Sequence, residues 1–290
     1  MSGEIRTDGL TKVYGDNVAL APLDLDVPAG QRVSLIGHNG SGKTTLIRML
    51  AGVLEPSDGT ATVAGHAAGE RDARASLSYL SDQPVFYDDL SVRQHLEYVA
   101  RLHRTERWEE HAEWLIETVG LTERADDLPA TFSRGLKQKA SIALAFVRPF
   151  EIVLIDEPFV GLDRAGRLAL LELMSWAHDD GATVVVATHE LSSVGASERL
   201  IALADGEVLY DGDPAGADPD SLADGVFDLR ADAPAVTTGG ADATAGADVG
   251  TTSRGDGGRD RAGSTPGDSP PAAGDESGGR RGERRRRSGS

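Results

Sequence analysis

Apolar residues along the chain occur in two kinds of run, and their alternation predicts the fold class. Short continuous runs rich in β-branched residues are expected for strands buried on both faces, and they cover residues 31–36, 152–155 and 183–187. Helical periodicity lies between and after them, at residues 45–51, 92–120, 140–147 and 168–178. Buried strands that alternate with helices predict an α/β protein with a mostly parallel sheet covered on both faces.

Further strands and one helical insertion complete the pattern. Residues 5–14 and 18–27 favour two strands joined by a tight turn, and residues 200–204 and 207–210 favour a hairpin around Asp205 and Gly206. A short strand is also expected at residues 60–64, and residues 77–80 form a further short apolar segment. We expect an antiparallel β subdomain beside the parallel sheet. The helical stretch at about residues 91–147, with Ser91 as its N-cap, interrupts the alternation and predicts a helical lobe.

The composition changes near residue 213. We expect one folded domain over residues 1–213, then a short packed extension within residues 214–230, where a few apolar residues remain. Residues 231–290 contain no aromatic side chain and consist almost entirely of Ala, Gly, Asp, Ser, Thr, Pro and Arg. Such a segment cannot bury enough apolar surface to fold, so it is predicted to be a disordered tail.

Charge and composition exclude several classes of function. The 290 residues carry a net charge of −18, with only four lysines, which indicates either a salt-rich cytoplasm or a genome composition that favours arginine. An acidic body argues against specific binding of nucleic acid. The absence of cysteine excludes disulfides and thiolate metal sites. No apolar run is long enough to span a membrane, and the start lacks a signal region, so we expect a cytoplasmic protein.

The strongest motif follows the buried strand at residues 31–36. It matches the phosphate-binding P-loop pattern G-x-x-x-x-G-K-[ST] and comprises Gly37, His38, Asn39, Gly40, Ser41, Gly42, Lys43 and Thr44, with Thr45 opening the next helix. Backbone amides of such a loop cradle phosphates at the positive end of a helix. Lys43 is expected to reach the terminal phosphates, and the Thr44 hydroxyl is expected to bind Mg²⁺.

Polar residues follow two other buried strands. Asp156 comes at the end of the run 152–155, where the carboxylate that holds Mg²⁺ in P-loop enzymes belongs. Its neighbour Glu157 is placed to act as a general base toward water. His189 follows the strand at residues 183–187; it could sense the terminal phosphate, or it could be an ordinary loop histidine.

In combination these motifs resemble the ATP-binding subunit of an ABC transporter over about residues 5–212. The P-loop resembles its Walker A motif, and residues 152–157 resemble Walker B with the catalytic glutamate Glu157. Residues 132–138 resemble the signature motif, residues 161–163 resemble the D-loop that ends in Asp163, and His189 resembles the switch histidine. Tyr14, which taken alone would be a half-buried strand aromatic, stands where the family stacks an aromatic on adenine.

This sequence departs from the family pattern in two places. In the signature, Arg134 and Leu136 replace a glycine and the glutamine, while Ser133 and Gly135, which contact the γ-phosphate bound by the opposite subunit, are kept. This variant resembles the ABC-2-type and Ecs-like exporter ATPases. In the Q-loop, the register from Pro84 places Asp82 where the family has glutamine, with Gln83 one position later. We expect Asp82 to take the role, including contact with Mg²⁺, with Gln83 as the alternative.

The resemblance implies a P-loop NTPase fold of the RecA-like kind that binds and hydrolyses ATP with Mg²⁺. Two such subunits, identical or different, would close head to tail on two ATP molecules and drive a membrane-spanning permease subunit, which would hold the protein at the inner face of the cell membrane. The second interpretation is a soluble ABC-type ATPase that acts on a protein assembly or on nucleic acid. The third is a nucleotide-gated module without turnover, against which Lys43, Asp156, Glu157 and His189 argue.

Overall fold

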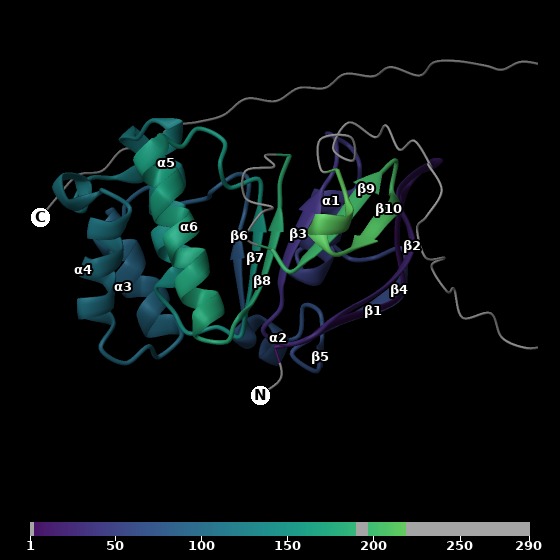
Figure 1. Cartoon of the computed structure of the whole chain (residues 1–290). Helices are drawn as coiled ribbons and strands as arrows, with labels where there is room; N and C mark the ends of the chain where they lie inside the picture. Colours follow the sequence, from purple (N-terminus) through teal and green to yellow (C-terminus); the bar gives the residue numbers. More distant parts are fainter. Residues whose placement is uncertain (1–2, 190–196, 219–290) are drawn as a thin grey trace, which may run out of the picture. The chain divides into compact units, whose positions relative to one another are not determined.

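The computed structural model of this protein describes residues 3–189 and 197–218. These residues form two β-sheets with helices between and beside them (Figure 1). One sheet has six strands in the order β10-β9-β3-β8-β7-β6, and the other has four strands in the order β2-β1-β4-β5. Of the extension expected within residues 214–230, the structure describes residues 214–218, which include one short 3-10 turn at Pro214–Gly216. Residues 219–230 and the expected tail lie outside the described residues.

The six-stranded sheet is mostly parallel, as the continuous apolar runs predict. Its five neighbouring strands β9, β3, β8, β7 and β6 run parallel, and β10 joins the edge antiparallel to β9. Every residue of β3, β7 and β8 is buried. The strands are β3 (Arg32–Ile36), β6 (Leu77–Leu80), β7 (Ile152–Asp156), β8 (Thr183–Ala187), β9 (Arg199–Ala204) and β10 (Glu207–Gly212).

The four-stranded sheet is antiparallel and forms the predicted β subdomain. Its long central strand pairs with β2 on one side and with β4 on the other, and its buried side chains face α1. The strands are β1 (Ile5–Tyr14), β2 (Asn17–Val27), β4 (Asp58–Val63) and β5 (His66–Ala67).

The helices cover both faces of the parallel sheet. Helix α1 lies between the two sheets, while α3, α4, α5 and α6 gather on the opposite side of the parallel sheet (Figure 1). The helices are α1 (Lys43–Leu50), α2 (Arg71–Ser76), α3 (Val92–Leu102), α4 (Trp108–Thr118), α5 (Arg134–Phe146) and α6 (Arg164–Asp179). Ser91 caps α3 in a capping box with Gln94, as its position before the periodic run predicts.

Alternate residues of the central strands divide the core into two clusters. In β7, Val153 and Ile155 belong to the cluster under α3 to α6, whereas Ile152 and Leu154 belong to the cluster around α1. The three lobe helices α3, α4 and α5 therefore share one continuous apolar cluster with α6 and with one face of the sheet. The helices α3 to α6 therefore pack on one face of the sheet through a single apolar core.

The structure differs from the sequence expectation in three local features. The periodic stretch at residues 92–120 is two helices, because Arg104 and Arg107 adopt left-handed backbone angles with φ of 56° and 52° and break the first helix after Leu102. The short helix α2 and the two-residue strand β5 were not predicted, since neither is long enough to show a period. Helix α5 begins at Arg134 and helix α6 at Arg164, four to six residues before their apolar periodicity starts.

Candidate active site

The loop between β3 and α1 is built around glycines that no other residue could replace. Gly37 and Gly42 have φ of 148° and 105°, in the region that favours glycine. A Cβ on Gly37 would collide with the carbonyl oxygen of Leu203, and one on Gly42 would lie 2.8 Å from the carbonyl oxygen of Ala19. The glycines of the motif therefore serve this turn and its close packing, as the pattern predicts.

Lys43 lies buried at the start of α1, with its ammonium group held over the loop. Its Nζ donates to the carbonyl oxygens of Gly37 at 2.7 Å and His38 at 3.1 Å, and it lies 3.6 Å from Oε1 of Glu157. Burial lowers the pKa of Lys43, and the carboxylate of Glu157 opposes that shift. The ammonium is thus a cation fixed at the N-terminus of a helix, which is where a phosphate binds.

Asp156 ends β7 directly beneath the loop. The Thr44 hydroxyl donates to its Oδ1 at 3.0 Å, and its Oδ2 is buried with no hydrogen-bond partner among the described residues. Burial raises the pKa of Asp156 to about 6. The Thr44 hydroxyl and the Asp156 carboxylate thus lie next to each other, and, within the described residues, the Oδ2 atom of Asp156 is free to accept a further interaction. Oxygen ligands of this kind fit a hard divalent cation such as Mg²⁺. The described residues contain no cluster of three or more His, Cys, Asp or Glu, so a cation here would depend on phosphate and water for its other ligands.

Glu157 and His189 meet at the ends of adjacent strands. The carboxylate oxygen Oε2 of Glu157 lies 2.7 Å from Nδ1 of His189, and the Glu157 amide donates to the carbonyl of Ala187, the last residue of β8. Glu157 has a φ of 45°, a strained backbone conformation that the β7–β8 pairing holds in place. Since a carboxylate accepts, Nδ1 of His189 carries the proton of this hydrogen bond.

A groove of about 550 Å³ opens along the loop and contains most of the predicted contacts. Tyr14 stands at its rim, 51% exposed, with Lys12 Nζ 5.1 Å from its ring centroid. Asp82 also lines this groove and pairs with Arg48 at 3.0 Å. The predicted residues that line the groove are Tyr14, Asn39, Gly40, Ser41, Gly42, Lys43, Thr44, Thr45, Asp82 and Glu157.

The two candidates for the Q-loop position face different cavities. Asp82 lines the same groove as the P-loop, whereas Gln83 lines a separate, larger groove on the side of the helical lobe. The Gln83 backbone is held by the hydroxyl of Ser81, which accepts from its amide and donates to its carbonyl. This placement favours Asp82 as the residue that reaches a bound nucleotide.

Three predicted residues form a second cluster, at the N-termini of α5 and α6. Ser133 caps α5, and Asp163 caps α6 by accepting from the amide of Gly166 at 2.7 Å. Gly135 touches the loop before α6, where an added Cβ would lie 2.5 Å from the carbonyl oxygen of Gly161. None of the three lines the P-loop groove formed by the described residues. The chain therefore presents two separate sets of predicted contact residues.

Four residues of the groove were not predicted as contacts: Asn17, Val18 and Ala19 from β2, and Asp205 from the turn before β10. They reach the P-loop through tertiary packing, since the amide of Gly206 in that turn donates to the carbonyl of Ser41. The only sequence signal was the pair of tight turns, which predicted hairpins and gave no information on what those hairpins touch.

The fold and this site define the class of P-loop nucleotide-binding proteins, and comparison with known proteins gives the family. Residues 20–160 match the family model described as ABC transporter. The transporter ATP-binding protein EcsA of Bacillus subtilis is 35% identical over 204 residues, which cover 69% of this chain and 83% of EcsA. This chain therefore belongs to the ATP-binding proteins of the ABC transporter family, and the predicted P-loop NTPase fold is confirmed.

Other similar proteins and one solved structure also carry names of ATP-binding proteins or cassettes. The SkfA peptide export ATP-binding protein SkfE of B. subtilis is 30% identical over 210 residues, which cover 71% of this chain and 88% of SkfE. The solved dimer of the ATP-binding cassette MJ0796 with ADP and phosphate is 25% identical with a TM-score of 0.66, covering 72% of this chain and 98% of that one. Human ATP-binding cassette sub-family A member 2 is 34% identical over 214 residues, but this chain spans only 9% of its length.

Within the described parts of the chain, no helix combines the length and the apolar character needed to cross a bilayer.

Proposed function

We propose that this protein hydrolyses ATP and that the hydrolysis drives a transporter. The observation that carries the proposal is the meeting of Lys43, Asp156, Glu157 and His189 at the carboxyl edge of one sheet, beside a loop of phosphate-binding geometry. In open α/β folds this edge is where ligands bind.

Each residue has a distinct task in the proposed reaction. The loop amides and Lys43 bind the β- and γ-phosphates of ATP, and Tyr14 stacks on the adenine. Thr44 and Asp156, with Asp82 nearby, hold Mg²⁺, which supplies charge neutralisation on the phosphates when it is bound. Glu157 accepts the proton of the attacking water, while His189 holds the Glu157 carboxylate in position and stabilises charge on the transferred group.

The second cluster supplies the other half of the site in trans. Ser133 and Gly135 lie outside their own chain's groove, so they contact a γ-phosphate bound by a partner subunit when two copies, or this chain and a related one, close head to tail. The dimeric MJ0796 cassette supports this arrangement. Asp163, whose pKa is lowered by the amide of Gly166 and by Lys139, stays ionised beside that interface.

We propose that the coupled partner is a membrane-spanning permease subunit and that transport is outward. The signature variant around Arg134 and Leu136 and the similarity to EcsA and SkfE support an exporter. Attachment to the permease would place this protein at the inner face of the cell membrane.

Phosphate release by the purified chain tests this function. Wild type should release phosphate from ATP with Mg²⁺ and not with a chelator, and Lys43→Ala should lose this activity. Mg²⁺-dependent release that Lys43→Ala retains would contradict the proposed site. Co-expression with candidate permeases, followed by purification of the membrane fraction, tests the partner: recovery of the chain only from the soluble fraction with every candidate would favour a soluble ABC-type ATPase.

A further inference from the structure

Arg48 is a cation beside the nucleotide site to which the proposed reaction gives no task. It lies on α1 one helical turn after Thr44, and residues four apart share one face of a helix. Its Nη2 lies 3.0 Å from Oδ1 of Asp82, and the two side chains are only 38% and 25% exposed. Asp82 lines the P-loop groove formed by the described residues, whereas Arg48 does not. The contact through which Arg48 can act on this groove is therefore Asp82.

The groove that would receive the phosphates is itself acidic. Among the described residues that line it, Lys43 is the one cation, and three residues are carboxylates: Asp82, Glu157 and Asp205. Lys43 Nζ already lies 3.6 Å from Oε1 of Glu157, so its charge is shared. Like charges repel, and ATP brings several more negative charges into this space. Binding of a polyphosphate here thus needs positive charge from outside the lining.

Asp82 also acts on the buried carboxyl that the proposed reaction uses. The strands β6 and β7 run parallel with Leu80 opposite Ile155, so the residues that follow them lie side by side. Burial is the main cause of the raised pKa of Asp156, the charge of Asp82 adds to the shift, and the charge of Arg48 opposes it. Arg48 is therefore close enough to offset Asp82 in the field that this edge of the sheet experiences.

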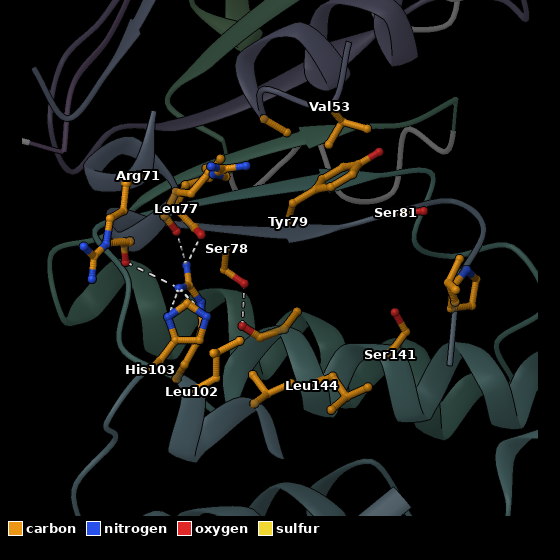
Figure 2. Close-up of a pocket in the computed structure, with 18 of the residues that line it drawn as sticks. Val53, Arg71, Leu77, Ser78, Tyr79, Ser81, Leu102, His103, Ser141 and Leu144 are labelled. Atoms are coloured by element: carbon orange, nitrogen blue, oxygen red, sulfur yellow. Dashed lines mark hydrogen bonds between the residues drawn. The ribbon is translucent and has the colours of Figure 1, made fainter. Parts of the chain in front are cut away.

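Tyr79 holds the guanidinium of Arg48 from a second side. Burial raises the pKa of Tyr79, and a hydrogen bond with Arg48 opposes that shift. Figure 2 shows the Tyr79 side chain on the same side of its strand as Val53 and opposite to Ser78. Arg48 thus lies between a neutral hydroxyl and a single carboxylate, and its position between them leaves it little freedom to pair elsewhere.

We propose that Arg48 is a positioning residue that holds Asp82 and compensates its charge, so that a carboxylate at this place in the groove tolerates ATP. The inference rests on the proposed function, which supplies the nucleotide, and adds a residue to its site. A neutral glutamine at position 82 would need no such partner. With Mg²⁺ bound, Asp82 has a second source of positive charge and depends less on Arg48. The compensation by Arg48 therefore matters most when no divalent cation is present.

An ordinary structural ion pair is the alternative, and it makes a different prediction. Partly exposed ion pairs contribute little to the stability of a fold. If Arg48 only supported the local structure, its loss would weaken ATP binding equally with and without Mg²⁺. The dependence of the loss on Mg²⁺ therefore separates the two roles.

Fluorescence titration of the full chain with methylanthraniloyl-ATP, in EDTA and in saturating Mg²⁺, measures this dependence. In EDTA, Arg48→Met should bind the nucleotide at least ~10-fold more weakly than wild type, and with Mg²⁺ the loss should be under ~3-fold. Arg48→Lys keeps the charge and should stay within ~3-fold of wild type in both conditions. Arg107→Met is the matched control, because it removes a cation from an exposed ion pair at the start of α4, and it should bind as wild type does.

Removal of the carboxylate should repair the loss. Asp82→Asn in the Arg48→Met background should restore binding in EDTA to within ~3-fold of wild type, because no uncompensated charge remains. Urea unfolding of every variant checks that the fold is intact. Arg48→Gln, which is equally uncharged, repeats the test with a polar side chain in case the methionine variant does not fold.

The same titrations decide against the proposal as clearly as for it. Binding in EDTA that Arg48→Met leaves at the wild-type level would overturn the proposal. So would a loss of equal size with and without Mg²⁺, or a loss that Asp82→Asn does not repair. Wild type that binds no nucleotide in either condition would instead refute the proposed function.

Discussion

Asp156→Asn should change how the stability of the fold depends on pH. The Asp156 carboxyl is fully buried, and burial raises its pKa from 3.8 to about 6. The folded protein therefore binds this proton more tightly than the unfolded chain does, and the wild type loses stability as pH rises from about 4 to about 6. An asparagine does not titrate, so the variant lacks this loss.

The size of the effect follows from the shift in pKa. One pKa unit equals about 1.4 kcal/mol, so ionised Asp156 lowers the free energy of unfolding by about 3 kcal/mol above pH 7 and by about half as much at pH 5. The asparagine NH₂ that replaces the unpaired Oδ2 adds a burial cost, but this cost does not depend on pH. Relative to wild type, the variant should thus gain roughly 1–2 kcal/mol between pH 5 and pH 7.5.

Urea unfolding of both proteins at the two pH values, without nucleotide or Mg²⁺, measures this difference. Thermal midpoints should show it as a relative gain of roughly 3–6 °C. The same variant should lose Mg²⁺-dependent ATP hydrolysis, because a ligand of the cation is gone. A free-energy difference between variant and wild type that stays constant from pH 5 to pH 7.5 would refute the reasoning, since it would mean that Asp156 titrates normally in the fold.

The other substitutions concern catalysis. Glu157→Gln should keep ATP binding and accumulate a closed dimer while turnover falls by ~10²-fold or more, as expected for a lost general base; near-normal phosphate release would remove Glu157 from that role. Asp82→Ala should reduce Mg²⁺-dependent turnover more than Gln83→Ala, because Asp82 lines the nucleotide groove and Gln83 does not. The reverse ranking in the same assay would show that the loop shifts and that Gln83 is the functional residue.

Much of the fold follows directly from the sequence pattern. Continuous apolar runs such as 152–155 predicted parallel strands buried on both faces, because such a run would expose apolar side chains to water in any other strand. The structure has a fully buried strand there. The glycine pattern of the P-loop predicted a tight turn at residues 37–42. The structure has this turn, and the backbone angles and close neighbours of Gly37 and Gly42 exclude a Cβ there. Short elements were missed for the opposite reason: α2 has six residues, too few to show a helical period.

The site was predictable only for residues that belong to a recognisable sequence motif. Thr44 and Asp156 lie 112 positions apart and are joined by a hydrogen bond. Both were expected to bind Mg²⁺, because the motif of Thr44 follows one continuous apolar run and Asp156 ends another. The approach of Asp205 to the P-loop and the pairing of Arg48 with Asp82 depend on side-chain packing that no local pattern records.

The central claim is that each catalytic site is shared between two chains, and a mixing experiment tests it most directly. Ser133→Arg disables the half of the site supplied in trans, and Lys43→Ala disables the half supplied by the P-loop. Each variant alone should be inactive. In an equimolar mixture of exchanging subunits, half of the dimers contain one intact site, so about a quarter of wild-type ATP hydrolysis should return. The expected value holds for a homodimer in which one intact site suffices for hydrolysis. A mixture that stays inactive, although both variants form dimers, would contradict either the shared site or the independence of the two sites.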